Sequence, residues 1–199
     1  MTLNLADLSA LLRDTFTAPR PTIRRLLDAG LPFGALAGAL VLVAVISAIL
    51  SEITIFLTPV PGGSEMIRGM VGGPLAVAVL QLVLLVLIVV GIDRVGRAMG
   101  GQGDLTGAVL VVVWMQVAMI ALQLAQMVTL VLVPPLASII GVLSIAVFFW
   151  LMSSFVAELH RFESIGRVVL MLLVGFIGLA IFLTFVLSLL GVSPPTEMM

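Results

Sequence analysis

The sequence predicts an all-α membrane protein, with five transmembrane helices preceded by an N-terminal amphipathic helical segment. The chain is 62% hydrophobic and 10% charged, with a mean hydropathy of +1.36. Soluble domains carry about 25% charged residues. Five apolar stretches are each long enough to cross a hydrocarbon core of about 30 Å, which takes about 20 helical residues. These stretches are residues 31–50, 73–92, 105–133, 136–155 and 168–190.

Residues 1–30 form a separate segment that is too polar to span a membrane. Apolar residues at helical spacing predict a first helix, which Pro19 and Pro21 interrupt. A second short helix is expected over residues 21–29, with a surface ion pair between Arg24 and Asp28. The favoured interpretation is an interfacial helix whose arginines lie near anionic lipid headgroups. The alternative is a helix packed against the bundle or a partner protein. The four arginines are Arg13, Arg20, Arg24 and Arg25.

The arginines divide unequally between the two sides of the predicted spans. Eight of the nine lie on the side of the N-terminus, and Arg68 alone lies on the other side. The positive-inside rule therefore predicts a cytoplasmic N-terminus. With five spans in residues 31–192, the short tail 193–199 is extracytoplasmic. The absence of lysine is typical of a GC-rich genome, so we expect a bacterial inner membrane protein with a periplasmic C-terminus.

Three glycines at the start of the first span predict a close helix contact. Gly30, Gly34 and Gly38 form two overlapping GxxxG steps, a pattern that lets another helix approach closely. Packing within the bundle is the favoured interpretation, and a homo-oligomer interface is the alternative. Asp104 or Thr106 is expected to cap the start of the third span.

Four glutamines are the strongly polar side chains inside the predicted spans: Gln81, Gln116, Gln123 and Gln126. An amide in hydrocarbon needs a partner, so these side chains should point inward and bond between helices. The alternative is a polar path for a small solute lined by Gln81, Gln116 and Gln123. Because no ionisable residue lies near the middle of a span, a proton-coupled transporter is disfavoured.

No cluster in the sequence predicts catalysis, a cofactor or a metal. The chain has no cysteine and one histidine. His160 lies in a turn with Glu158 and Glu163, at a spacing that matches no zinc pattern, and we expect a solvated loop or a helix-end contact. Gly100–Asp104 lacks the GxxxxGK[ST] order of a phosphate loop. A net charge of −1 gives no field for nucleic acid.

Three segments give a resemblance that covers almost the whole chain. These are Leu11–Leu27, which contains Leu-Leu-Arg-Asp-Thr-Phe-Thr-Ala-Pro, the stretch Met99–Leu110, and the Glu-Leu-His turn at 158–160. This layout resembles the bacterial branch of the Yip family of Ypt-interacting membrane proteins. Eukaryotic members resembling this layout bind Rab-type GTPases through cytosolic N-terminal regions, but their acidic-aromatic Gly-Pro motif is absent here. The resemblance implies a fold and a topology, and no reaction.

These observations together predict a non-enzymatic, membrane-organising factor that acts through protein or lipid contacts. Membrane lipids, anionic ones in particular, and a second copy or another membrane protein are the expected partners. The alternatives are the glutamine-lined channel or transporter and an accessory subunit of a larger membrane complex.

Overall fold

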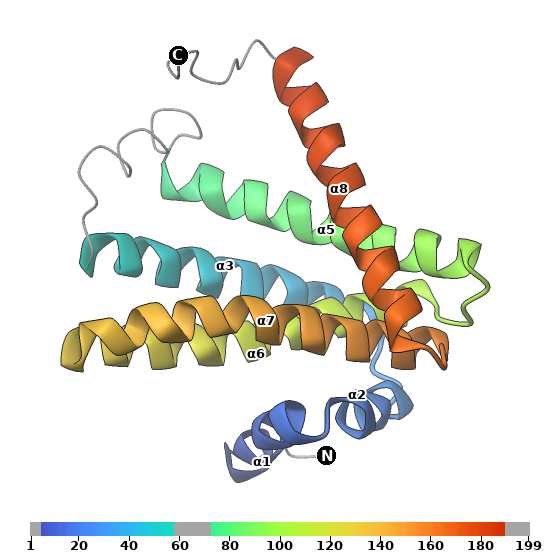
Figure 1. The fold of residues 1–199 in the computed structure, drawn as a ribbon, viewed down its shortest axis with the longest axis horizontal. Helices are drawn as coiled ribbons and strands as arrows, with labels where there is room; N and C mark the ends of the chain where they lie inside the picture. Colours follow the sequence, from blue (N-terminus) through green and yellow to red (C-terminus); the bar gives the residue numbers. More distant parts are fainter. Residues whose placement is uncertain (1–4, 58–72, 190–199) are drawn as a thin grey trace.

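The computed structural model describes residues 5–57 and 73–189, and every regular element in these residues is a helix (Figure 1). The all-α fold class is therefore confirmed for the described residues. Two short helices precede the long ones. The helices are α1 Leu5–Thr17, α2 Pro19–Asp28, α3 Phe33–Leu57, α5 Pro74–Ala98, α6 Leu105–Leu132, α7 Pro134–His160 and α8 Ile165–Leu189.

Four of the long helices have the length and composition to cross a membrane. They are α3, α5, α6 and α7, and each overlaps one predicted span. In α8 the apolar stretch found among the described residues is Val168–Phe182, which is shorter. Four spans are thus supported, and the count of five stays a prediction. The tail 193–199 and Arg68 lie outside the described residues.

Local chemistry explains where the helices begin and end. The Asp104 carboxylate accepts a hydrogen bond from the Gly107 amide at 2.9 Å, which confirms the predicted cap of α6. Pro134 opens α7, where a missing amide proton costs nothing. Gly30 has φ +61° in the turn between α2 and α3, a conformation that glycine adopts without strain.

Helix α6 is the centre of the bundle and packs against α3, α5 and α7. Its first half is buried from Gly107 to Met115, as is the last part of α7. The core therefore lies at one end of the bundle, where α5 and α7 end and α3, α6 and α8 begin. We call this the arginine-rich end, because Arg24, Arg94, Arg97 and Arg161 lie there. Figure 1 shows α8 running steeply across α5, away from the other long helices.

The N-terminal helix pair, α1 and α2, packs against the bundle. Helix α2 contacts α7 and α6, and Ile23 is 0% exposed. Figure 1 shows the pair on the side of α6 and α7 remote from α5. For α2 the favoured interfacial interpretation was wrong, because Ile23 is buried in the core and Leu26 and Leu27 pack against it. On α1, Leu8 is exposed, and for that helix the interfacial interpretation stays a prediction. The stripe identified the buried face but could not distinguish lipid from protein as its partner.

The glycines of the predicted GxxxG contact do not hold helices together within the described chain. Gly30 lies in a turn before α3, and Gly34 and Gly38 are exposed on α3. A Cβ atom built on any of them meets no described atom within 4 Å. Helix α3 packs instead through its other face, which carries the core residues Leu36, Leu40, Val43 and Ala44. The intramolecular interpretation is corrected, and an oligomer contact stays a prediction.

Candidate functional site

The arginine-rich end is organised around His160, the last residue of α7. Its Nδ1 accepts a hydrogen bond from the Gly103 amide at 3.2 Å, and its Nε2 lies 3.0 Å from the Ile92 carbonyl oxygen. Since Nδ1 accepts, Nε2 carries the proton and donates to Ile92, which is the neutral tautomer. The ring is 1% exposed. A helix-end contact is therefore what the structure shows, and the predicted alternative of a solvated loop was wrong.

Glycines surround the imidazole because the ring leaves no room for a side chain. A Cβ atom on Gly96 of α5 would overlap the ring, and one on Gly101 would lie 2.5 Å from Nδ1. A Cβ atom on Gly103 would lie 2.7 Å from Leu159. The Gln102 amide also donates to the His160 carbonyl oxygen at 3.3 Å. We call His160 and its contacts with Ile92, Gly96 and the 101–103 loop the His160 node, which ties α5, α7 and the start of α6 together.

A buried carboxylate lies beside this node. Asp93 is 2% exposed and its Oδ2 pairs with Arg97 one turn later on α5, while Arg94 Nε lies 3.7 Å from the same oxygen. Arg97 places a positive charge against this buried carboxyl group.

Two polar contacts attach the N-terminal helix pair to the bundle. Arg24 Nε donates to Glu158 at 2.5 Å, so Arg24 pairs with α7 and the predicted pairing with Asp28 was wrong. The Trp114 indole N–H donates to the Thr15 hydroxyl at 2.9 Å, in a buried position. These contacts join residues 134 and 99 positions apart in the chain. They hold α1 and α2 at a defined position against α6 and α7.

The four arginines predicted to meet lipid headgroups take different positions. Arg13 is exposed on α1, and Arg25 is exposed with a 3.4 Å ion pair to Asp14. Arg24 is held by Glu158 and Arg20 is half-buried on α2. Arg13 and Arg25 therefore remain available to a surface outside the chain.

The glutamines do not form one lining. Gln123 and Gln126 of α6 line a cavity of about 150 Å³ with Thr54 of α3 and Ser138 of α7. The lining of this cavity includes neither Gln81 nor Gln116. It lies toward the Pro134 end, the end opposite to the arginine-rich one. Here Gly141 of α7 lies against the Gln126 amide.

The chain matches the model of a known protein family. The model described as the Yip1 domain matches residues 13–186, which is most of the chain. The chain belongs to the Yip1 domain family. No curated protein and no solved structure matches it. The resemblance inferred from the sequence is confirmed at the level of the family.

Two of the three segments that gave the resemblance meet at the His160 node. The glycine-rich stretch 100–104 and the turn at His160 lie about 60 residues apart in sequence, and Gly103 bonds directly to His160. Both lie within the matched residues of the Yip1 domain. In this family member they serve as a structural junction, with both imidazole nitrogens engaged in backbone contacts.

The side chains at the arginine-rich end make hydrogen bonds, ion pairs and apolar contacts. Among residues 5–57 and 73–189, no three His, Cys, Asp or Glu side chains gather where they could hold a metal ion. Sequence reasoning missed Asp93, Glu158 and the Trp114–Thr15 contact as structural ties. The i, i+4 spacing of Asp93 and Arg97 could have predicted their ion pair. The partners in the Arg24–Glu158 and Trp114–Thr15 contacts are far apart in the chain, so no local pattern predicts them.

Proposed function

We propose that this Yip1 domain protein is a non-enzymatic membrane-organising factor that acts through protein or lipid contacts of its N-terminal helix pair. The observation that supports this proposal is the packing of the N-terminal helix pair against the bundle. Ile23 of α2 lies in the core and Leu26 and Leu27 pack against it, while the side chains of Arg13 and Arg25 are exposed. A rigid helix pair that presents arginines beside a membrane suits anionic headgroups or an acidic partner surface.

The proposed orientation places this surface in the cytoplasm of a bacterium. The support is the eight-to-one distribution of arginines and the positive-inside rule. Reporter fusions at Met199 test it together with the five-span count. We expect an active alkaline phosphatase fusion there, since an odd number of spans places the C-terminus outside the cytoplasm. An inactive fusion, with an active cytoplasmic reporter at the same position, would contradict five spans.

The contact surface is tested by a matched pair of arginine changes. Arg13→Gln with Arg25→Gln removes charge without touching the core, and each basic residue near an anionic surface contributes about 1 kcal/mol. We expect weaker retention of phosphatidylglycerol or of a copurified protein in nanodiscs, at unchanged thermal stability. Arg24→Gln is the control, because it breaks the tie to Glu158 and should lower stability. Equal retention by all variants would contradict the proposal.

The same purification tests the remaining alternative functions. A stoichiometric membrane partner identified by mass spectrometry would favour an accessory subunit of a larger complex. For a channel lined by glutamines, the supporting observation is the cavity at Gln123 and Gln126. Solute flux in proteoliposomes that is lost in a Gln123→Leu variant would favour that channel.

A further inference from the structure

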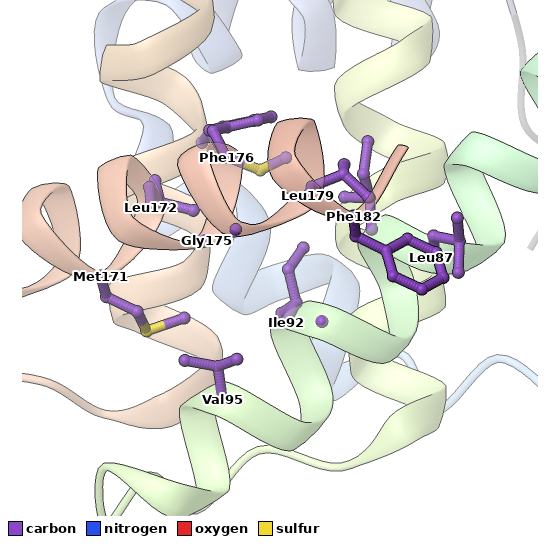
Figure 2. Close-up of a pocket in the computed structure, with 13 residues that line it drawn as sticks. Leu87, Ile92, Val95, Met171, Leu172, Gly175, Phe176, Leu179 and Phe182 are labelled. Atoms are coloured by element: carbon purple, nitrogen blue, oxygen red, sulfur yellow. The ribbon is translucent and has the colours of Figure 1, made fainter. Parts of the chain in front are cut away.

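Helices α5 and α8 diverge and leave a groove between them that is distinct from the contacts described so far. The groove has a volume of about 270 Å³, close to the lower bound of about 300 Å³ for small-molecule sites. Figure 2 shows Leu87 and Phe182 at one end, with Val95 and Met171 toward the other. Met152 of α7 contributes to the lining from the bundle, so the groove is closed on that side.

Every side chain that lines the groove is apolar or absent. The residues come from α5, α7 and α8 and include three glycines, Gly91, Gly175 and Gly178. A Cβ atom on any of these glycines meets no described atom within 4 Å. The glycines therefore widen the groove and are not buried under a packed helix. A cavity with no polar group offers nothing to orient a polar solute, which favours a hydrocarbon occupant.

The length of the groove fits one leaflet of a bilayer. On α5 the lining runs from Leu87 to Val95, which corresponds to about 12 Å of helix. On α8 it runs from Met171 to Phe182, or about 16 Å. Half of a hydrocarbon core of about 30 Å is about 15 Å. The groove therefore accommodates a stretch of acyl chain that lies within one leaflet and starts at the arginine-rich end.

A cation lies where the headgroup of such a lipid would be. Arg94 directly precedes Val95 on α5 and lies one turn after Gly91, so it flanks the arginine-rich end of the groove. Its side chain is 77% exposed, and its contact with Asp93 is long at 3.7 Å because that carboxylate pairs closely with Arg97. Guanidinium groups bind phosphate oxygens through charge-assisted hydrogen bonds.

We propose that the α5–α8 groove binds a phospholipid, with one acyl chain along the groove and the phosphate of its headgroup on Arg94. This site lies on different elements from the N-terminal helix pair and does not depend on the proposed function of that pair. A single-chain site at the bundle edge would hold one lipid along α8, whose outward residues such as Leu170, Val174 and Ile181 are exposed.

Photocrosslinking of the full chain in nanodiscs tests the acyl position. The probe is phosphatidylglycerol with a diazirine in its acyl chain, diluted into phosphatidylcholine. We expect crosslinks concentrated on peptides that carry Gly91, Gly175 and Gly178. Gly175→Leu and Gly178→Leu should fill open space, fold normally and lose these crosslinks. Ala180→Leu is the matched control, since it adds the same bulk to an exposed position of α8 outside the groove.

Arg94→Gln tests the headgroup position. Losing one basic residue near the headgroup should weaken retention of the probe about fivefold. Arg13→Gln, on the N-terminal helix pair, should leave the groove crosslinks unchanged, so a failure of the proposed function and a failure of this site are told apart. Crosslinks spread evenly around α8, or unchanged in Gly178→Leu, would overturn the proposal. A dimer that Gly178→Leu abolishes and Ala180→Leu retains would overturn it in favour of a second copy.

Discussion

The two ends of the α6–α7 hairpin have similar apolar sequences and very different surroundings. At the arginine-rich end, Phe155 is 0% exposed and belongs to the hydrophobic core. At the Pro134 end, Val142 is 70% exposed. Hydrophobicity therefore does not mark the core of this protein. Since lipid tails are as apolar as leucine, what distinguishes the packed end is close fit and polar ties between helices.

The largest loss of stability at the packed, arginine-rich end is expected from His160→Ala. The change leaves the Gly103 amide and the Ile92 carbonyl without the ring and opens a cavity among α5, α6 and α7. Cavity formation with buried unpaired groups costs about 2–5 kcal/mol. Thermal unfolding in mild detergent, followed by tryptophan fluorescence, should show a large drop in Tm. A Tm equal to that of the unchanged protein would mean that the node does not hold the helices together.

The second-largest effects on stability are expected from two glycine changes on α5, which should shift Tm in opposite directions. Gly96→Ala places a methyl group against the imidazole, and overpacking of this kind costs about 1–3 kcal/mol. Gly91→Ala meets open space and gains up to about 1 kcal/mol of helix propensity. The two Tm values should therefore move in opposite directions. Equal shifts would show that the ring adapts to the added methyl group.

A smaller effect is expected from Thr15→Val on α1. The change keeps the shape of the side chain but removes the acceptor of the buried Trp114 indole N–H, at a cost of about 1–2 kcal/mol. Because the contact joins α1 to α6, the N-terminal helix pair should open more often. Limited trypsin cleavage should then be faster after Arg24 and Arg25, with Thr17→Val, on the exposed side, as the control. An unchanged cleavage rate would show that other contacts hold α1 in place.

The smallest effect is expected at the Pro134 end, from Val142→Ala on α7. The side chain is largely exposed, so its truncation should change stability by less than about 0.5 kcal/mol. The same unfolding measurement applies, with the buried Val156→Ala as the matched change in the other half of α7. If both changes lowered Tm equally, the Pro134 end would be packed by a surface outside the chain, such as a second copy.

The long helices and their ends were readable in the sequence because the signals for them are local. Apolar stretches of about 20 residues predict spans wherever they pack, and an Asp three residues before Gly107 predicts a cap without any distant partner. The break at Pro19 between α1 and α2 is of the same kind.

Contacts between distant residues could not be read in this way. The sequence placed His160 in a solvated turn or at a helix end, and only the fold brought Gly96 and Gly103 around it. It also assigned Gly34 and Gly38 to a helix contact, although the structure leaves them exposed.

The chain's composition and arginine distribution by themselves identify a membrane protein and predict its orientation, since the transfer of apolar helices into lipid depends on composition and length. Tertiary structure alone shows which face of each helix packs on protein and which is left exposed. In an apolar solvent both partners are equally hydrophobic, so the choice follows from shape, from small residues beside large ones such as Gly96 beside His160, and from paired charges such as Arg24 with Glu158.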